Sequence, residues 1–340
     1  MKILATGGAG YVGCRLVPAL ADMGADVRVV DKLVFGEDGL NGSRDRVELL
    51  RADIRSLDAD DLKGVDTVVH LAGLSNDPTA EFNPSANKTI NLDATVRLAR
   101  LAKENGVGRF IYASSCSVYY TERPDDRLRD ETDPVDPKAP YSWSKRQAEV
   151  GVLELASPDF CPVVLRKGTV FGYSPRMRFD LVVNTFTRDA YAHRRLTVHA
   201  GGRMWRPLLH IDDAVDAYKR VITVDEDVVR GQIYNVLSDN YQVLAIAHEV
   251  RRAAEERRAL DVELNIQPVG ISRSYRVDGR KFRESFGITL SRDIRSAVHE
   301  MWDALATIDD LNSPIYCNIT WLELLADMEC RLRRMGGSPF

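Results

Sequence analysis

A tyrosine and a lysine one helical turn apart are the residues of this sequence best suited to acid–base chemistry. Tyr141 and Lys145 open a segment with a helical pattern, directly after the proline-bounded stretch 134–140. Residues four positions apart share one face of a helix. A free phenol titrates at a pH of about 10, and an adjacent ammonium favours the charged phenolate. The pair alone could equally be an ordinary surface tyrosine and lysine, so its surroundings must decide.

Hydroxyl side chains follow the end of one predicted strand. The strand Arg109–Ala113 runs into Ser114, Ser115, Cys116 and Ser117. In open parallel sheets ligands bind at the carboxyl ends of the strands, so we expect these side chains beside a bound molecule. A serine there could hydrogen-bond a substrate hydroxyl and help move its proton to the phenolate. The alternatives are serines that cap their own backbone and, for Cys116, a small buried filler rather than a proton-transfer group.

A glycine-rich loop follows the apolar, strand-like run at the N-terminus. Gly7, Gly10 and Gly13 lead from this run into a helical segment. The order matches the dinucleotide fingerprint, in which a tight turn brings the backbone to a pyrophosphate at a helix N-terminus. A glycine-rich turn without a ligand is the alternative, but Asp31 ends the next predicted strand, 18 residues after Gly13. That carboxylate would accept from ribose hydroxyls and repel the extra phosphate of NADP. The sequence therefore predicts NAD as cofactor, with Lys32 weakening the preference over NADP.

Short apolar runs alternate with helical patterns through the first half of the chain. Several runs are apolar almost throughout, which is typical of strands covered on both faces, and the alternation indicates a parallel sheet with right-handed crossovers. The predicted strands are Lys2–Thr6, Asp26–Asp31, Val47–Ala52, Thr67–Leu71, Arg109–Ala113 and Pro162–Lys167. The predicted helices are Tyr11–Met23, Ser56–Leu62, Asn87–Asn105 and Tyr141–Ala156, with a further amphipathic helix at Ile319–Met335.

After Phe171 this pattern becomes less regular. We therefore predict an α/β fold, a Rossmann-type doubly wound parallel sheet that binds NAD in residues 1–171. Residues 172–340 are expected to form mainly a smaller C-terminal substrate-binding lobe, with some segments returning to the first domain.

Composition and charge exclude several classes of partner. The 340 residues carry a net charge of −4, which gives no basic footprint for nucleic acid or anionic lipid. No apolar run reaches membrane-spanning length, and the opening MKILATGG enters a strand rather than a signal peptide. The five cysteines are widely spaced and form no disulfide or metal-binding pattern. We expect a cytoplasmic protein with no metal site, no membrane contact and no nucleic-acid partner.

Taken together, the motifs resemble those of the extended short-chain dehydrogenase/reductases, specifically the NAD-dependent epimerase/dehydratase group. The resemblance covers roughly residues 1–290 and rests on TGGAGYVG at 6–13, Asp31, Asp53-Ile54, HLAG at 70–73, Asn91, SSCSVY at 114–119 and YSWSK at 141–145. It implies that Ser115, Tyr141 and Lys145 form the catalytic set. It also implies that Asp53 and Ile54 lie at the adenine, and that Asn91 buttresses the site. The expected cofactor contacts are Gly7, Gly10, Tyr11, Val12, Gly13, Asp31, Lys32, Asp53, Ile54, Leu71, Ala72, Gly73, Asn91, Ser114, Tyr141 and Lys145.

The same resemblance favours an epimerase over its relatives. Dehydratases of the group usually carry Thr-Asp-Glu, whose acids assist the loss of a hydroxyl, where this chain has Ser115-Cys116-Ser117. The expected reaction is therefore nucleotide-sugar epimerisation through a 4-keto intermediate, with transient hydride transfer to bound NAD. The alternatives are a nucleotide-sugar dehydrogenase or 4-ketoreductase, a dehydratase on the same scaffold, and a non-catalytic NAD-sensing protein.

Arginines in the second half of the chain indicate the nucleotide end of the site. Arg206 resembles the diphosphate-binding arginine of the family, and a guanidinium fork suits phosphate oxygens. A second arginine, either Arg273 or Arg276, precedes a D-x-x-K-like element at 278–281. The resemblance thus implies a nucleotide-diphosphate sugar as substrate, and a homodimer formed through the helices near 87–105 and 141–156. The expected substrate contacts are Ser75, Asn76, Asp77, Ser115, Cys116, Ser117, Thr169, Arg178, Arg206, Arg273 and Arg276.

Overall fold

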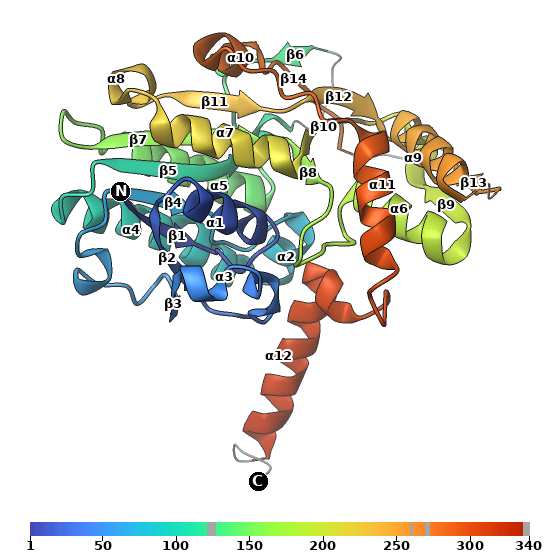
Figure 1. Ribbon diagram of the computed structural model, residues 1–340, viewed down its shortest axis with the longest axis horizontal. Helices are drawn as coiled ribbons and strands as arrows, with labels where there is room; N and C mark the ends of the chain where they lie inside the picture. Colours follow the sequence, from blue (N-terminus) through green and yellow to red (C-terminus); the bar gives the residue numbers. More distant parts are fainter. Residues whose placement is uncertain (121–126, 259–260, 269–272, 336–340) are drawn as a thin grey trace.

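A seven-stranded parallel sheet forms the centre of the molecule (Figure 1). The computed structural model describes residues 1–120, 127–258, 261–268 and 273–335. Across the sheet the order is β11-β7-β5-β4-β1-β2-β3, and every neighbouring pair is parallel. The bounds are β1 Lys2–Thr6, β2 Asp26–Asp31, β3 Glu48–Arg51, β4 Thr67–His70, β5 Arg109–Ser115, β7 Cys161–Lys167 and β11 Ile233–Val236. This order confirms the predicted doubly wound sheet, with its topological switch point between β1 and β4.

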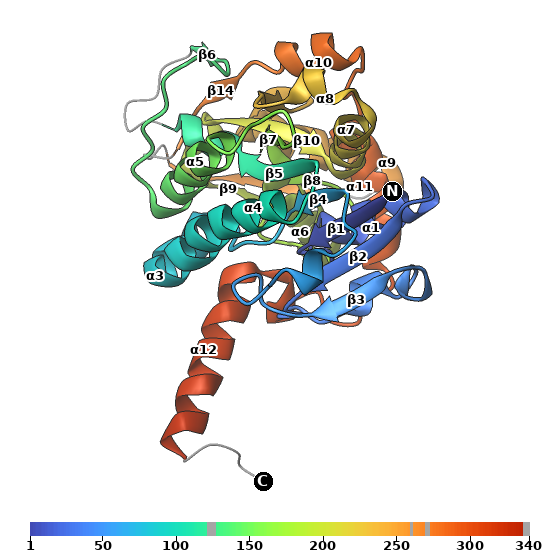
Figure 2. The ribbon, with the colours of Figure 1, turned by 90° about the vertical axis from the view of Figure 1, so that its left-hand side faces the viewer.

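Helices cover both faces of this sheet, as the end-on view shows (Figure 2). On one face α1, α7 and α10 share a core with strand residues such as Val29 and Ile111. On the other face α4 and α5 pack over a second core that contains Phe110 and Val164. Because both faces are covered, β5 and β7 are buried along nearly their whole length. The bounds are α1 Gly13–Asp22, α4 Ala94–Glu104, α5 Pro140–Leu153, α7 Ile211–Thr223, α8 Glu226–Val229 and α10 Arg280–Phe286.

The helix expected over 87–105 is interrupted. The chain forms α3 (Pro84–Asn87), then a π-helical turn, η4 (Lys88–Asp93), and only then α4. Within η4 the side chain of Asn91 turns back onto the loop after β4, where its Nδ2 donates to the carbonyl oxygen of Leu74 and its Oδ1 accepts from the Leu74 amide, both at 2.8 Å. Single π-helical turns occur often at functional sites, and this one fixes the loop that follows β4.

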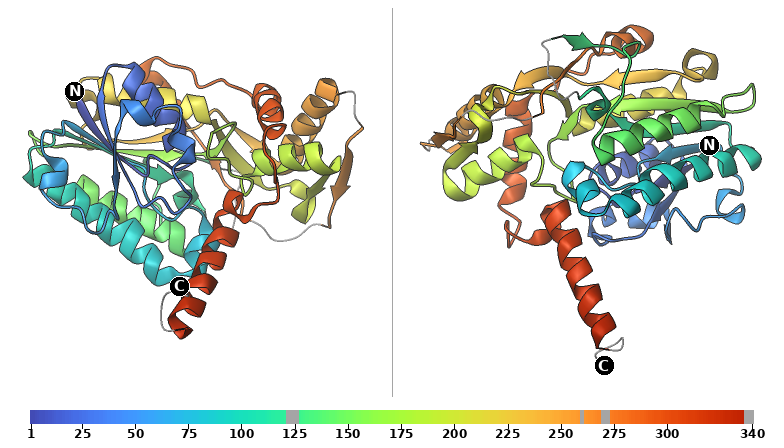
Figure 3. Two further views of the ribbon diagram at one scale, coloured as in Figure 1. Left: turned by 60° about the horizontal axis from the view of Figure 1, so that its bottom comes forward. Right: turned by 180° about the vertical axis from the view of Figure 1, so that it is seen from behind.

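A smaller group of elements packs beside the carboxyl ends of the strands (Figure 3). Helices α6, α9 and α11 surround a third core that contains Phe186, Val250 and Trp302. The chain returns to the large sheet at β11, which pairs with β7. The domain boundary predicted at residue 171 stays a prediction. The remaining elements are β6 Leu128–Arg129, β8 Thr169–Phe171, β9 Arg195–Val198, β10 Trp205–His210, β12 Asp239–Gln242, β13 Glu263–Ile266, β14 Arg276–Val277, α2 Asp77–Phe82, α6 Val182–His193, α9 Val243–Arg258 and α11 Ile294–Leu305.

The last helix, α12 (Asn318–Arg334), leaves the body of the molecule and projects away from it (Figures 1 and 2). Its first residue, Asn318, is buried, and the indole of Trp321 donates a 2.7 Å hydrogen bond to the carbonyl oxygen of Val34. Beyond this anchor Met328 and Leu332 are exposed. Among the described helices, α12 included, none combines the length and the apolar character that crossing a bilayer requires.

Candidate functional site

A cleft opens at the carboxyl ends of the strands. Its cavity volume is about 350 Å³, within the roughly 300–1,000 Å³ that is typical of a small-molecule pocket. The cleft is therefore large enough to hold a small-molecule ligand. The lining residues come from the segments 7–13, 71–77, 113–120, 141–145 and 167–181, together with Phe35, Arg206, Arg273, Tyr275 and Asn318.

The glycine loop forms one end of the cleft. Gly7 has a φ of +72°, and a Cβ built on it would lie 2.7 Å from the backbone nitrogen of Ala72. A Cβ on Gly13 would lie 2.4 Å from the carbonyl oxygen of Gly8. Only glycine tolerates both the backbone conformation at Gly7 and this spacing. The loop therefore brings the N-terminus of α1, with its positive dipole end, to the wall of the cleft, which is the arrangement that binds a pyrophosphate.

Asp31 ends β2 beside the glycine loop. Its carboxylate accepts from the backbone amides of Ala9, at 3.0 Å, and Leu33, at 2.8 Å. Burial raises the pKa of this carboxyl, and the two amide hydrogen bonds oppose that shift. The carboxylate is thus held rigidly against the loop, in the position that the dinucleotide fingerprint gives to the ribose-binding acid.

Asp53 and Ile54, which follow β3, lie outside the described lining of the cleft. The Asp53 carboxylate accepts from the Arg55 guanidinium at 2.7 and 2.9 Å and lies 3.4 Å from the Lys32 ammonium. The hydrogen bonds from Arg55 hold the pKa of Asp53 below its ordinary value. Ile54 is buried in the core under α4 and α5. Their predicted adenine contacts stay predictions.

Tyr141, Lys145 and Ser115 meet in the middle of the cleft. Lys145 Nζ lies 5.9 Å from the centroid of the Tyr141 ring and donates a 3.0 Å hydrogen bond to the carbonyl oxygen of Ala113. The phenol is hydrogen-bonded to Ser115, which ends β5. Proline at the first turn of α5 presets the backbone, so that the helix starts where Tyr141 reaches the strand end. The sequence prediction placed these three residues together, and the structure brings them to one point.

Burial dominates the electrostatics at this point. It raises the pKa of Tyr141 to about 12, an effect increased by the nearby Asp77 carboxylate and opposed by the Arg178 guanidinium and the hydrogen bond with Ser115. Burial also lowers the pKa of Lys145 to about 7, and the ammonium of Lys167 adds to that shift. The phenol thus needs a further positive charge beside it to become a base near neutral pH.

A buried ion pair lies close to Lys145. Arg166 donates to Glu149 through Nε at 2.9 Å and Nη2 at 2.7 Å, and both side chains are almost fully buried. Ser114 Oγ donates to the same carboxylate at 2.5 Å, and Arg166 Nη1 donates to Tyr119 Oη at 2.7 Å. The Glu149 carboxylate opposes the lowering of the Lys145 pKa. Ser114 is therefore tied into this network through its side chain while its residue still lines the cleft.

Cys116 lies outside the lining, whereas its neighbour Ser117 belongs to it. The Cys116 thiol is fully buried and contacts the carbonyl oxygen of Arg166 at 3.1 Å. Burial raises the pKa of this thiol, so that it is a poor proton-transfer group. Ser117 Oγ is buried and has no hydrogen-bond partner among the described residues. Of the two, Ser117 has the free capacity to bind a substrate hydroxyl.

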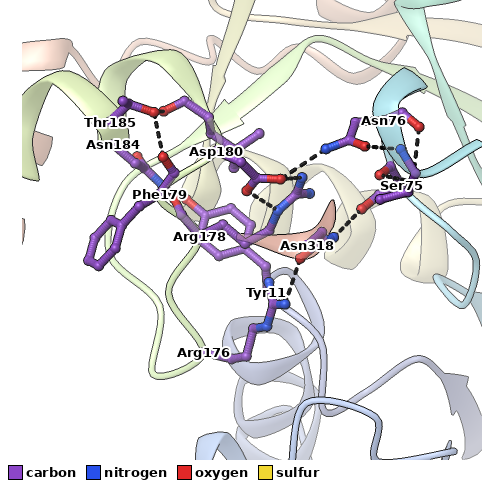
Figure 4. Close-up of polar contacts among 12 residues, drawn as sticks. Tyr11, Ser75, Asn76, Arg176, Arg178, Phe179, Asp180, Asn184, Thr185 and Asn318 are labelled. Carbon is purple, nitrogen blue, oxygen red and sulfur yellow. Dashed lines mark hydrogen bonds and ion pairs between the residues drawn. The ribbon is translucent and has the colours of Figure 1, made fainter. Parts of the chain in front are cut away.

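The loop after β4 and the loop after β8 face each other across the cleft (Figure 4). Asn76 Nδ2 donates to Asp180 at 2.9 Å, and Asp180 accepts from Arg178 at 2.8 and 2.9 Å. Asn76 has a φ of +77°, and its Oδ1 caps α2 by accepting from the amide of Thr79 at 3.1 Å. These contacts hold the Arg178 guanidinium beside Tyr141 and account for the conformation of the loop.

Asn318, the first residue of α12, contacts both of these loops. Its Nδ2 donates to Ser75 Oγ at 2.7 Å, and its Oδ1 accepts from Arg176 Nη2 at 2.6 Å (Figure 4). Burial lowers the pKa of Arg176 to about 10, so this guanidinium still carries its charge at neutral pH. It also lies over the ring of Phe35, 3.8 Å from its centroid.

Two of the three arginines expected at the nucleotide end line the cleft. Arg206, on β10, donates to the carbonyl oxygens of Trp205 and Arg273. Arg273 forms ion pairs with Asp77 and Glu81. Arg276 does not belong to the described lining, and its guanidinium lies over the Trp205 ring, 4.6 Å from the centroid. Of the two alternatives for the second arginine, the structure brings Arg273 to the cleft.

Several polar atoms of the lining are buried without a hydrogen-bond partner among the described residues. They are Asp77 Oδ1, Ser117 Oγ, Ser142 Oγ and Arg176 Nε. Buried polar groups are normally paired, so unpaired ones in a cleft indicate a polar ligand. The glycine cradle, the α1 N-terminus and these donors and acceptors fit a dinucleotide and a polyhydroxylated second ligand. In the part of the chain that the structure describes, no cluster of His, Cys, Asp and Glu has the arrangement of a metal site.

The structure also shows lining residues that the sequence prediction missed. Among them are Phe35, Lys167, Tyr275 and Asn318. Lys167 ends β7, so the rule that ligands bind at the carboxyl ends of parallel strands could have found it. Nothing in the local sequence distinguishes the other three. Among the expected cofactor contacts, Asp31, Lys32, Ala72 and Asn91 also lie outside the described lining.

Comparisons with known proteins relate this site to one family. The model of the NAD dependent epimerase/dehydratase family matches residues 3–236. The chain is 26% identical over 255 residues to a putative UDP-glucose 4-epimerase of Methanocaldococcus jannaschii, covering 73% of this chain and 82% of that protein. It is 27% identical over 270 residues to dTDP-D-glucose 4,6-dehydratase of Mus musculus, covering 75% of this chain and 73% of that protein.

A solved structure of similar fold carries both kinds of ligand. MoeE5 in complex with UDP-glucose and NAD is 27% identical, with a TM-score of 0.76 over 91% of this chain and 100% of that chain. The complex of MoeE5 with UDP-glucuronic acid and NAD has a TM-score of 0.75 at 26% identity, over 90% of this chain and 100% of that chain. These similarities connect the cleft with a protein that holds NAD and a nucleotide sugar together.

Proposed function

We propose, from the premise that this chain belongs to the NAD-dependent epimerase/dehydratase family, that it is a nucleotide-sugar epimerase working through a 4-keto sugar. As a member of that family the chain is an NAD-dependent enzyme. The step from family to reaction rests on which acids the cleft contains. Sugar dehydration needs a group that protonates the leaving hydroxyl, whereas epimerisation at a keto-forming carbon needs none.

The acid content of the cleft supports epimerisation. Asp77 is the one carboxylate among the described lining residues, and it is already paired with Arg273. The position next to Ser115 holds Cys116, whose buried thiol faces the Arg166 carbonyl oxygen rather than the cleft. Among the described residues, no carboxylic acid next to Ser115 is thus placed to protonate a leaving hydroxyl. This is the observation that carries the proposal.

Each of the main residues of the cleft has a proposed role in this reaction. Bound NAD would accept a hydride from the sugar carbon that becomes the ketone and return it to either face. The Tyr141 phenolate would take the proton of the reacting hydroxyl, with Ser115 hydrogen-bonded to both. Lys145 would hold the phenolate through its positive charge. Arg206 and Arg273 would bind the diphosphate, since guanidinium groups pair well with phosphate oxygens.

The experiment follows the cofactor and the sugar together. The purified protein is assayed for bound NAD and incubated, without added NAD, with UDP-, dTDP-, GDP- and CDP-hexoses while the products are followed by NMR. We expect an epimer to accumulate to equilibrium with no net NADH. Stoichiometric NADH formation would instead identify a dehydrogenase, and a deoxy-keto sugar would identify a dehydratase. The absence of any turnover, combined with an intact cofactor, would support a non-catalytic NAD-sensing protein.

We also propose that the chain forms a homodimer through α4 and α5. The outer face of η4 and α4 contains a hollow lined by the apolar Leu92, Val96 and Leu101 and by the charged Asp93, Arg97, Arg100 and Glu104, and Trp143 on α5 is 37% exposed. Apolar side chains on an outer helix face are typical of a subunit interface. Light scattering after size-exclusion chromatography tests this proposal: a Val96→Glu variant should elute as a monomer if the face is the interface.

A further inference from the structure

Arg176 lies against the cofactor end of the cleft, although it belongs to the loop after β8. Its backbone is hydrogen-bonded to the thiol of Cys14, in the first turn of α1. A Cβ built on Gly39, in the segment after β2, would lie 3.2 Å from the Cβ of Arg176. The guanidinium carbon lies 3.8 Å from the centroid of the Phe35 ring. Arg176 is thus packed between the start of α1 and the segment that follows Asp31.

The surroundings of Arg176 differ from those of Arg206, which is expected at the nucleotide end of the site. Among the described residues, different charged groups act on the two guanidinium groups. Those that act on Arg176 are Arg178 and Asp180, in its own loop, and Asp31, beside the glycine loop. Those that act on Arg206 are Arg273 and Asp77. The two arginines therefore serve separate parts of the cleft.

The guanidinium of Arg176 is buried and only partly paired. The residue is 8% exposed and lines the cleft. Nη2 donates to Asn318 Oδ1 at 2.6 Å, whereas Nε is buried with no hydrogen-bond partner among the described residues. The carboxylates near it are engaged elsewhere, since Asp180 accepts from Arg178 and Asp31 accepts from two backbone amides. A buried cation with an unused donor that faces a cleft indicates an anionic ligand.

Helix α12 holds this arginine in two ways. Asn318, its first residue, accepts from Nη2 of Arg176. One turn later, Trp321 Nε1 donates to the carbonyl oxygen of Val34 at 2.7 Å, and Val34 directly precedes Phe35. The helix thus fixes both the guanidinium and the segment that carries the ring beneath it (Figure 4 shows the contact of Arg176 with Asn318).

We propose that Arg176 binds the pyrophosphate of NAD, and that Asn318 is a positioning residue that orients its guanidinium. The pyrophosphate carries the negative charge of NAD, and the N-terminus of α1 beside Arg176 is the place where the glycine loop would bind it. A guanidinium suits phosphate oxygens because its donors are fixed in one plane. The inference concerns cofactor binding and does not depend on the proposed epimerase reaction.

The test measures how long the protein retains its cofactor. Wild type and variants are incubated with an excess of isotopically labelled NAD, and the exchange of bound for labelled NAD is followed by mass spectrometry. The variants are Arg176→Met, Arg176→Lys, Asn318→Ala, the double variant Arg176→Met/Asn318→Ala and, as control, Arg195→Met. Arg195 is exposed on β9 and pairs with Glu263 at 3.7 Å, so its variant also removes one arginine. Circular dichroism and melting temperature verify that each protein is folded.

Competition with fragments of the cofactor locates the contact. The labelled, NAD-loaded proteins are titrated with ADP, which contains a diphosphate, and with adenosine, which contains none. We expect Arg176→Met to release NAD roughly 10- to 100-fold faster than the wild type, the range of a hydrogen bond to a charged group. The inhibition constant of ADP should rise by a similar factor, while that of adenosine stays unchanged. Arg195→Met should behave as the wild type does.

The remaining variants separate the two proposed roles. Arg176→Lys should lie between the wild type and Arg176→Met, because it keeps the charge and loses the planar donors. Asn318→Ala should accelerate NAD release when Arg176 is present and have no further effect in the double variant, since it acts through that arginine. An additive effect would show that Asn318 acts independently and would overturn its positioning role.

Two results would overturn the role of Arg176. The first is release of NAD at the wild-type rate from folded Arg176→Met, which would assign the unused donor to the other ligand of the cleft. The second is an equal loss of affinity for ADP and adenosine, which would place the contact at the adenosine. Either result would leave the epimerase proposal standing, because that proposal is tested by its product.

Discussion

The ammonium of Lys145 lies 5.9 Å from the centre of the Tyr141 ring, and its 3.0 Å hydrogen bond to the Ala113 carbonyl oxygen holds it at the end of β5. In this position its positive charge would stabilise a phenolate at Tyr141. The protein alone leaves the pKa of Tyr141 at about 12. Binding of the positive nicotinamide would add the charge that brings the pKa toward neutral, so cofactor binding and activation of the base are coupled.

Replacing Tyr141 with phenylalanine should lower kcat by about 10²–10⁴-fold, the usual contribution of a general base. The change removes only a hydroxyl, so NAD content and melting temperature should stay close to those of the wild type. Tyr191→Phe, in the second lobe beside Trp302, is the control and should retain full activity. Wild-type turnover in Tyr141→Phe would mean that another group takes the proton.

Gly7→Ala should yield a protein with little bound NAD. The new Cβ would lie 2.7 Å from the Ala72 nitrogen at a φ of +72°, so either the glycine loop or the strand end must move away from the pyrophosphate position. Absorbance and chromatographic analysis of released nucleotide measure the loss. Gly42→Ala is the matched control, because its Cβ would meet no heavy atom within 4 Å. Full NAD content in Gly7→Ala would show that the loop is not the cofactor cradle.

His70 should make stability depend on pH in a defined window. Its Nδ1 lies 2.6 Å from Thr6 Oγ1 and its Nε2 lies 2.9 Å from Thr95 Oγ1. Burial lowers the pKa of His70 to about 3, from 6.5 for a free histidine. Between these values the unfolded chain binds a proton that the folded one does not, so stability falls as the pH is lowered from 6.5 toward 3.

The slope of unfolding free energy against pH in that window should exceed that of a His70→Gln variant by at most about 1.4 kcal/mol per pH unit. Urea titrations at pH 4.5, 5.5 and 6.5 compare the two proteins. Parallel curves would contradict the assignment of His70 as a neutral, buried group.

Glu149→Gln should destabilise the fold by about 3–5 kcal/mol, because it leaves the buried Arg166 guanidinium without its counter-charge. Loss of the carboxylate would also remove the group that opposes the lowering of the Lys145 pKa. Chemical denaturation measures the first effect. Glu154→Gln, at an exposed position just after α5, should change stability little. A variant Glu149→Gln as stable as Glu154→Gln would show that the ion pair contributes nothing net.

Local patterns were sufficient to predict the central sheet and the glycine loop. The buried strands are apolar runs, and the residues that shape the cofactor turn are adjacent in sequence, so both follow from the order of residues alone. The interruption of the helix at η4 was missed because it depends on Asn91 bonding to Leu74, a contact between separate segments. The orientation of Cys116 toward the Arg166 carbonyl oxygen likewise depends on the pairing of β5 with β7.

The second half of the site was harder to predict for the same reason. Arg273 and Arg276 are equivalent in sequence context, and only the fold directs one to the cleft and the other to Trp205. Lys167 could have been predicted, because it ends β7 and ligands bind at the carboxyl ends of parallel strands. Tyr275 and Asn318 come from segments whose local sequence has no ligand-binding pattern.

The contact of Asn318 with Ser75 joins positions separated by 243 residues. A nascent chain can therefore complete its large sheet long before it completes this wall of the cleft. Until the final helix has been synthesised and its first turn docked, Arg176 lacks the amide that holds it. A shortened form that ends before Asn318 would keep the large sheet but lose the contacts of Asn318 with Ser75 and Arg176. Cleavage before Asn318 should therefore impair the cleft, whereas a tag attached at the exposed far end of α12 should leave it intact.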